Sequence, residues 1–194
     1  MKENHPENPF ERYADDVVVH CASKVEAERL LEKIRSRLRL CKLELHPEKT
    51  KIIYCKDNKR DGEDQNTKFD FLGYTLKKRE AKSKTGKLFC SFLPAISDKA
   101  IKKIKETIKE LEVHSRTERA LSDIAELCNP IIRGWMTYYG KFYKSALDEA
   151  LKCMDERLER WAVKKYNKFK GSIKRAREWL LSIKERDKTL FAHW

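Results

Sequence analysis

The sequence has no long apolar run. Its uninterrupted apolar stretches are a few residues long, Val17-Val18-Val19 among them, whereas a helix that crosses a membrane needs about 20 apolar residues. The N-terminal residues Met1-Lys-Glu-Asn-His-Pro also lack the apolar segment of a signal peptide. We therefore expect a cytoplasmic protein that is neither secreted nor inserted into a membrane.

The cysteines lack the spacing of a metal site. The six cysteines lie 14 to 38 residues apart, and the sequence contains no Cys-x-x-Cys pair or Cys/His cluster. Zinc sites need closely spaced ligands of this kind, so the spacing argues against one. We expect reduced cysteines that serve as small core residues and carry no chemistry.

Acidic residues are too few to balance the basic ones. The chain holds 44 Lys and Arg against 31 Asp and Glu, a net charge of +13, which predicts a polyanionic partner. Most of the excess lies near the C-terminus, where residues 157–188 hold 12 basic and 4 acidic groups. Residues 98–156, by contrast, hold 11 of each.

Aromatic residues are interleaved with this basic segment, and two interpretations fit. The segment either tracks phosphates and stacks bases on its aromatic rings, or it is a solvated helix face above a core stripe of aromatics. A charge of +8 over residues 157–188 favours nucleic acid. The aromatic residues are Trp161, Tyr166, Phe169 and Trp179. The candidate RNA-binding residues of the segment are Lys164, Lys165, Lys168, Lys170, Lys174, Arg175 and Arg177.

Hydrophobic periodicity predicts strands around one helix in the first half of the chain and only helices in the second half. The fold class is therefore α+β, with a helical bundle after a small sheet-containing unit. The first half is expected to contain a hairpin of residues 10–13 and 17–21, a helix over 24–40 with Ser23 as its N-cap, strands over 43–45 and 51–55, a loop over 57–67, and a second hairpin of residues 69–76 and 87–93.

The second half is expected to contain five helices, and proline and glycine mark several of their ends. Ser97 is a good N-cap for the first of them. Pro130, after Asn129 as N-cap, is expected to start the third helix, and Gly140 and Gly171 to close the third and fourth. The predicted ranges are 97–112, 118–128, 130–139, a helix through 147–161 and a helix through 173–183.

Two adjacent carboxylates, Asp15 and Asp16, lie at the tip of the first predicted hairpin. Consecutive strand side chains point to opposite faces, so both carboxylates reach one site only if the turn bends them inward. Carboxylate oxygens are the ligands that Mg²⁺ prefers, and a bound metal would relieve their repulsion. The alternative is that this Asp-Asp pair is ordinary turn chemistry.

Four blocks of the sequence resemble the reverse transcriptases encoded by bacterial group II introns. Tyr13-Ala-Asp-Asp16 resembles the catalytic motif of reverse transcriptases. Leu43-Glu-Leu-His-Pro-Glu-Lys-Thr-Lys51 and Phe69-Asp-Phe-Leu-Gly-Tyr74 look like the next two blocks of this family. Asn129-Pro-Ile-Ile-Arg-Gly-Trp-Met-Thr-Tyr-Tyr-Gly140 is similar to the signature of its maturase, or thumb, domain. The blocks follow the family's order over nearly the whole chain.

The resemblance implies a partial reverse-transcriptase palm over residues 1–96, made of antiparallel strands and one helix, followed by an all-α maturase or thumb bundle over 97–194. It implies an RNA-directed DNA polymerase and intron maturase. The partners it implies are group II intron RNA, an RNA template, a DNA primer and a deoxynucleotide (dNTP) substrate.

The resemblance also implies site residues. Asp15 and Asp16 would help to hold two Mg²⁺ ions for phosphoryl transfer, and Asp15 would be the stronger ligand. Lys49 is a candidate general acid or charge stabiliser for pyrophosphate, with Lys51 as a rival. Arg133, within the maturase signature, joins the candidate RNA-binding residues. The residues implied at the primer and template are Tyr13, Ala14, Leu72, Gly73 and Tyr74.

The sequence departs from the family's pattern upstream of the hairpin. Family members carry the third metal-binding aspartate and the finger strands there, whereas 12 residues precede Tyr13 here. The two-metal Mg²⁺ site is therefore expected to be incomplete, and we expect that this chain by itself does not polymerise DNA. The later aspartates match no metal position of the family; they are Asp57, Asp61, Asp64 and Asp70.

Two functions stay open on this basis. The chain is either the C-terminal part of a group II intron reverse transcriptase and maturase, or a stand-alone module that binds RNA and assists splicing, with a vestigial palm. A third possibility is a reverse transcriptase of another bacterial retroelement. That protein would share the hairpin but would not require the block over residues 129–140.

Overall fold

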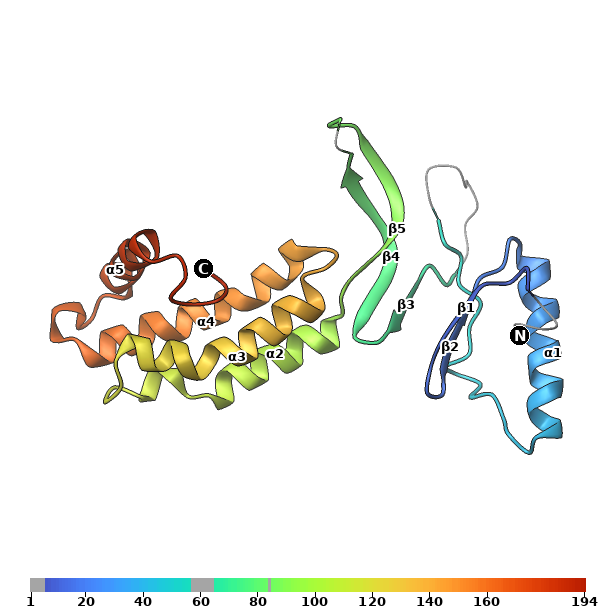
Figure 1. Cartoon of the computed structure of the whole chain (residues 1–194), viewed down its shortest axis with the longest axis horizontal. Coiled ribbons are helices and arrows are strands. Elements are labelled where there is room, and N and C mark those ends of the chain that lie inside the picture. The colour runs from blue at the N-terminus through green and yellow to red at the C-terminus, as the bar shows by residue number, and fades with distance from the viewer. Residues whose placement is uncertain (1–5, 57–64, 84) are drawn as a thin grey trace. The chain divides into compact units, whose positions relative to one another are not determined.

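The computed structural model describes residues 6–56, 65–83 and 85–194 (Figure 1). The chain is α+β as predicted, and the described residues are 51% helical and form two small antiparallel sheets. It divides into two compact units. The first unit comprises Met1–Phe71 and Lys77–Phe92, and the second comprises Leu72–Leu76 and Leu93–Trp194.

The first unit begins with the predicted hairpin. Strands β1 (Phe10–Tyr13) and β2 (Asp16–Val19) pair antiparallel, and Tyr13 lies opposite Asp16 at the closed end. A two-residue turn joins them, and its first residue, Ala14, has a φ of 52°. Two-residue hairpin turns of the favoured types need a positive φ at this position, so the backbone follows the usual turn geometry.

Helix α1 (Lys24–Leu40) follows with the predicted N-cap. The hydroxyl of Ser23 accepts a hydrogen bond from the Glu26 amide at 3.2 Å. The Glu26 carboxylate in turn accepts from the Ala22 amide at 2.7 Å and from the side-chain amide of buried Asn8 at 2.8 Å. The hydrogen bond from Asn8, followed by that from Ala22, lowers the pKa of Glu26. These bonds fix the start of the helix against the segment that leads into the hairpin.

The strands predicted over 43–45 and 51–55 are wrong. Both segments lack strand structure, although the amide of Tyr54 donates to the carbonyl of Asn66 at 2.8 Å. Apolar alternation over three to five residues forms a strand only where a neighbouring strand offers a hydrogen-bonding ladder. The loop predicted over 57–67 lies mostly outside the described residues, since 57–64 are not among them.

A three-stranded sheet comes next, in the order β3 (Lys68–Phe71), β4 (Tyr74–Lys82) and β5 (Leu88–Ile96). The turn between β3 and β4 is Leu72-Gly73, with positive φ values of 50° and 79°. Positive φ at both central residues is the type I′ geometry that suits the twist of a hairpin. A side chain at Gly73 would begin 3.0 Å from the hydroxyl oxygen of Tyr139, so the turn approaches a helix of the second unit closely.

The rest of the second unit is a helical bundle in which α2, α3 and α4 run alongside one another (Figure 1). Its core consists of fully buried apolar side chains from several helices, with Ile108, Ile132 and Trp161 among the largest. The elements are α2 (Asp98–Glu110), η1 (Val113–Ser115), α3 (Leu121–Tyr139), α4 (Lys144–Lys165), η2 (Asn167–Phe169) and α5 (Ile173–Arg186). Among the described residues, no helix is long and apolar enough to cross a membrane.

The two helices predicted over 118–128 and 130–139 are a single helix, α3, which continues through Pro130. Proline removes one helical hydrogen bond and usually ends a helix. Here Cys128 and Ile132, two residues before and two residues after it, are fully buried in the core. Tertiary packing therefore carries the helix past the proline.

Asn129, which was expected to cap a helix, instead holds the C-terminal segment. Its side-chain amide donates to the Leu190 carbonyl at 2.9 Å, and its side-chain oxygen accepts from the Ala192 amide at 2.8 Å. Phe191, between these two residues, is fully buried. The maturase-like signature thus has a direct structural role in fixing the last residues of the chain.

The end of α4 also differs from the prediction. The helix stops at Lys165, and the short helix η2 follows before Gly171. Gly171 has a φ of 76° and lies in the turn that leads into α5. Its left-handed conformation therefore serves the entry of α5 and not the end of α4.

Asp155 on α4 holds the last two side chains of the chain. Its Oδ1 lies 3.0 Å from Nε2 of His193 and accepts a hydrogen bond from Nε1 of Trp194 at 2.9 Å. Burial alone would raise the pKa of Asp155, but the hydrogen bond and charge of His193 and the hydrogen bond from Trp194 hold it below its ordinary value. The C-terminal segment is thus fixed by Asn129 on α3 and by Asp155 on α4.

The Gly73 turn yields a first prediction. Gly73→Ala should destabilise the protein by about 1–2 kcal/mol, because a Cβ is strained at this φ and would press on Tyr139. Gly134→Ala is the matched control, since a Cβ at this helical glycine would meet nothing within 4 Å. The control should gain about 0.5–1 kcal/mol from improved helix propensity. Urea unfolding of both variants measures the difference, and equal effects would contradict the geometry.

Asp155 yields a prediction about pH. Its folded-state pKa is lowered, so its charge stabilises the fold above the pKa of the unfolded chain, and this contribution disappears as pH falls through the folded pKa. The melting temperature of the wild type should therefore fall more steeply with acid, below about pH 4, than that of Asp155→Asn. Asp148→Asn, at an exposed position of the same helix, should follow the wild-type profile. Parallel profiles for wild type and Asp155→Asn would contradict the assignment.

Candidate nucleic-acid interface

The acidic tip of the first hairpin is open to solvent. Asp15 occupies the second turn position and Asp16 opens β2, and both carboxylates are exposed. Tyr13, the last residue of β1, is exposed as well. Arg12 steadies the turn, because its Nε donates to the carbonyl of Ala14 at 2.9 Å. The hairpin thus presents Tyr13, Ala14 and both aspartates together at one end.

Lys49, the candidate charge stabiliser, lies in an exposed turn after α1. The amide of Thr50 donates to the carbonyl of His46 at 3.0 Å and closes this turn. Lys51, its rival, is also exposed. Over residues 6–56 the structure shows no hydrogen bond or ion pair between either lysine and Asp15 or Asp16.

The carboxylates present do not complete a magnesium site. Mg²⁺ requires near-octahedral coordination by about six oxygens, of which protein carboxylates supply only some. Asp15 and Asp16 offer two carboxylates, and the described part of the chain contains no group of three or more His, Cys, Asp or Glu that could hold a metal ion. Asp70 lies within β3, and the other later aspartates, Asp57, Asp61 and Asp64, lie outside the described residues.

The predicted primer segment, Leu72 to Tyr74, packs on the end of α3. The hydroxyl of Tyr138 donates to the Leu72 carbonyl at 2.8 Å, and the hydroxyl of Tyr74 donates to the Tyr138 carbonyl. The Tyr74 ring lies 5.5 Å from the rings of both Tyr138 and Tyr139. Burial, and then the neighbouring tyrosines, raise the pKa of Tyr74. Two of the recognised sequence blocks, the one that ends at Tyr74 and the maturase-like signature, therefore contact each other directly.

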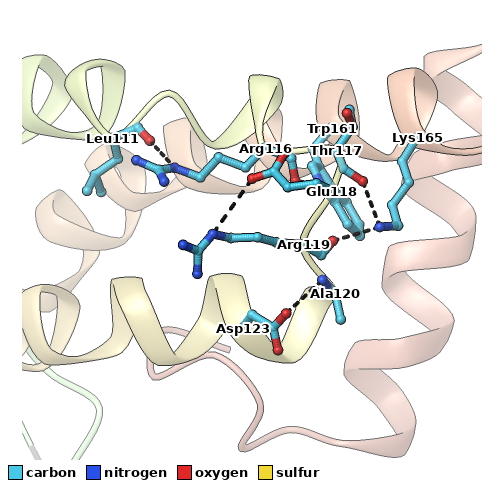
Figure 2. A network of polar contacts seen from close by, with 9 residues as sticks. All are labelled: Leu111, Arg116, Thr117, Glu118, Arg119, Ala120, Asp123, Trp161 and Lys165. Carbon is cyan, nitrogen blue, oxygen red and sulfur yellow. Dashed lines mark hydrogen bonds and ion pairs between the residues drawn. The ribbon is translucent and has the colours of Figure 1, made fainter.

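Lys165, one of the candidate RNA-binding residues, makes its hydrogen bonds within the protein (Figure 2). Its ammonium donates to the carbonyls of Thr117 at 2.8 Å and Arg119 at 2.7 Å. Trp161, one turn earlier on α4, donates from Nε1 to the Arg116 carbonyl at 3.0 Å. Both side chains hold the segment between α2 and α3 against α4.

The same segment is stabilised by its own side chains (Figure 2). Nε of Arg116 donates to the Leu111 carbonyl at 2.9 Å, and the Asp123 carboxylate accepts from the Ala120 amide at 3.0 Å. None of these bonds was predicted from the sequence. They join residues far apart in the chain, or depend on the path of the turn, and no periodic pattern signals them.

Arg177 is a second candidate that pairs within the protein. Its guanidinium binds the carboxylate of buried Glu159 through two hydrogen bonds, of 2.7 and 3.0 Å. This paired geometry joins α5 to α4 and satisfies a carboxylate that would otherwise be buried without a partner. Arg177 is itself exposed, but this pairing leaves it less free to bind a phosphate than its neighbours Lys174 and Arg175.

The aromatic residues of the basic segment lie mainly in the core. Trp161 and Phe169 are buried, whereas Tyr166 and Trp179 are half-buried. The interpretation as a core stripe therefore holds for Trp161 and Phe169, which offer no open face to a base. The ammonium of Lys168 lies over three of these rings, 4.8 Å from the centre of Phe169, 5.5 Å from that of Trp179 and 5.7 Å from that of Tyr166.

The exposed cations gather around the start of α5. Lys170 precedes the helix, and Lys174 and Arg175 lie in its first turn, which contains no acidic residue. Cations are unfavourable by a few tenths of a kcal/mol or more at a helix N-terminus, where the backbone already carries partial positive charge. This arrangement lowers stability slightly and creates a positive potential that suits phosphate groups. Lys164 and Lys168 add further exposed positive charge.

Arg133 is exposed on α3 and borders an open hollow of about 450 Å³. Lys188 provides a second cation there, and the C-terminal segment forms the opposite wall. The other lining residues are Met136, Thr137, Thr189, Phe191 and Ala192.

Comparison with known protein families gives two matches. The family described as "Group II intron, maturase-specific domain" matches residues 101–179, and the family described as "Reverse transcriptase (RNA-dependent DNA polymerase)" matches residues 1–76. No curated protein matches the chain. The first match contains the maturase-like signature, whose Asn129 holds the C-terminal segment, and the second contains the hairpin with both exposed aspartates. The chain belongs to the group II intron reverse transcriptase/maturase family.

Proposed function

We propose that this chain binds group II intron RNA and assists its splicing, through a maturase domain over residues 97–194. The observation that supports this most strongly is the group of exposed cations around the N-terminus of α5, formed by Lys170, Lys174 and Arg175, with Lys164 and Lys168 exposed earlier in the basic segment. These side chains carry positive charge that no acidic residue of the first turn offsets. Arg133, on α3, is proposed as a further phosphate contact.

We propose that residues 1–96 are part of a reverse-transcriptase palm. In this proposal Asp15 and Asp16 contribute metal ligands, Lys49 faces the pyrophosphate, and the primer and template contact Tyr13, Ala14 and the Leu72-Gly73-Tyr74 segment. The open hairpin tip and the tight Gly73 turn support these roles. Because Asp15 and Asp16 alone do not complete the coordination of Mg²⁺, RNA-directed DNA polymerisation would need further metal ligands.

The alternative, a module that binds RNA without any polymerase chemistry, is supported by one contrast within the chain. The helical unit buries a continuous core from Ile96 to Phe191. Among the described residues of the first half, by comparison, Leu30 is the one buried apolar side chain before Ala95. RNA binding by the helical unit does not depend on an active palm.

The phosphate contacts predict a strong dependence of RNA affinity on salt. The slope of log affinity against log salt concentration should become shallower by about 2 when Lys170, Lys174 and Arg175 are all replaced by Gln, because each phosphate contact contributes about 0.7–0.9. Filter binding of a transcribed group II intron RNA over a salt series measures this slope.

The matched control replaces Lys99, Lys103 and Lys105, which are exposed on α2, by Gln. It removes the same charge and should leave a slope close to that of the wild type. Equal slopes for the two triple variants would show that the charge near α5 makes no specific contact. A wild-type affinity independent of salt would overturn the phosphate-binding proposal altogether.

The palm proposal predicts the outcome of a primer-extension assay. The purified chain, with Mg²⁺, deoxynucleotides and a DNA primer annealed to an RNA template, should give no extended product. Product that disappears in Asp15→Ala would show that these residues suffice for polymerisation, and it would contradict the proposal. Product that persists in Asp15→Ala would indicate a contaminating polymerase.

A further inference from the structure

The turn between α3 and α4 exposes an unusual set of aromatic side chains. Tyr138 is 47% exposed, Phe142 57% and Tyr143 38%. The other exposed large apolar residues of the second unit, Leu127, Ile173 and Leu181, are aliphatic and separated in the sequence. Three partly exposed rings within six residues form a distinct surface, which we call the aromatic turn (residues 138–144).

Contacts beneath the surface hold two of these rings in place. Tyr138 donates its hydroxyl to the Leu72 carbonyl at 2.8 Å, and its ring meets that of Tyr139 edge to face at 4.8 Å. Phe142 meets the Tyr74 ring edge to face, with centres 5.5 Å apart and planes at 88°. Each ring therefore keeps part of its surface open in a fixed orientation, which lowers the entropic cost of binding a flat partner.

The aromatic turn is also positively charged. Lys141 and Lys144 are both exposed, and no acidic residue occurs between Tyr138 and Asp148. Lys144 begins α4, whose first turn also lacks an acidic residue, so the positive end of the helix dipole adds to its charge. Aromatic rings flanked by cations are the arrangement that binds single-stranded nucleic acid, in which bases stack on rings and phosphates meet lysines.

We propose that the aromatic turn is a stacking platform for an unpaired RNA strand. The proposal rests on RNA being the partner of this chain, as argued above, but it assigns a separate surface. Helix α4 has 22 residues, with the aromatic turn at its first residue and the cations around the start of α5 beyond its last. At 1.5 Å per residue the two surfaces are about 33 Å apart along the helix, so one structured RNA can reach both through different parts.

Charge decides between RNA and a protein partner. An exposed aromatic patch can also bind a second polypeptide. In a chain with a net positive charge, a protein-binding patch of this kind would favour neutral or acidic residues around the rings. The two lysines of the turn, in a chain with net charge +13, would make self-association repulsive. The same charge attracts a phosphate backbone.

The test uses the full chain and a fluorescein-labelled 12-nucleotide oligouridylate, which has no duplex structure. Phe142→Leu/Tyr143→Leu removes two ring faces while keeping apolar side chains, and it should weaken binding about tenfold or more in fluorescence anisotropy. Leu127→Ala/Leu181→Ala is the matched control, since it removes exposed apolar surface elsewhere on the helical unit. The control should bind like the wild type.

A second measurement does not depend on the variants folding. When the wild-type chain is photocrosslinked to a 12-mer containing 5-iodouridine, the oligonucleotide should become attached to peptides that include residues 138–143. Crosslinks confined to other peptides, or wild-type affinity in a folded Phe142→Leu/Tyr143→Leu variant, would overturn the platform. A change in oligomeric state of that variant with unchanged RNA affinity would also overturn it, and would assign the surface to a second copy.

The failure of this inference is distinguishable from failure of the proposed function. If the wild type binds intron RNA with the expected salt slope but the aromatic turn neither crosslinks nor contributes affinity, only the platform is wrong. If the wild type binds neither intron RNA nor the oligouridylate, the RNA-binding function itself is wrong, and the platform fails with it.

Discussion

Burial of the apolar face of α4 is the constraint on which the helical unit depends. Leu147, Leu151, Met154, Leu158 and Trp161 recur at helical spacing and are almost completely buried between α2, α3 and α5. Burying a large apolar side chain of this kind contributes about 1.5–3 kcal/mol. Because the helix is fixed in this way, its polar side chains have fixed positions too. Trp161 and Lys165, near the end of the helix, hold the segment between α2 and α3, and Asp155, near its middle, holds the last residues of the chain.

The basic residues of this unit divide into two groups with different roles. Lys165 and Arg177 bind carbonyls or a carboxylate of the protein itself, and so contribute to the fold. Lys170, Lys174 and Arg175 lie outside, at a helix end that gains nothing in stability from positive charge. Positive charge at this position is explained most simply by a negatively charged partner, and this is the physical basis for proposing that the start of α5 binds RNA.

The reverse-transcriptase half has a different balance of forces. Its hairpin is a two-stranded sheet, which is marginal alone, and it is steadied by Asn8 and Glu26 at the start of α1. Val25, Leu40 and Leu43 leave apolar surface exposed around this helix. The Leu72-Gly73-Tyr74 segment comprises the turn after β3 and the first residue of β4, and it packs, within the second unit, on Tyr138 and Tyr139 of the maturase-like signature.

The sequence by itself determined the local features, because neighbouring residues encode them. The hairpin with its acidic tip, α1 with its Ser23 cap, and the start of α2 at Ser97 all formed as predicted, and the ordered motifs identified the family. Tertiary structure decided what depends on distant partners. The apolar segments over 43–45 and 51–55 form no strand, because no strand among the described residues pairs with them. Pro130 lies within a helix because Cys128 and Ile132, on either side of it, are buried in the core. Tertiary structure also decided which lysines are exposed. Lys165 is held against the protein by hydrogen bonds to carbonyls more than forty residues away in the sequence.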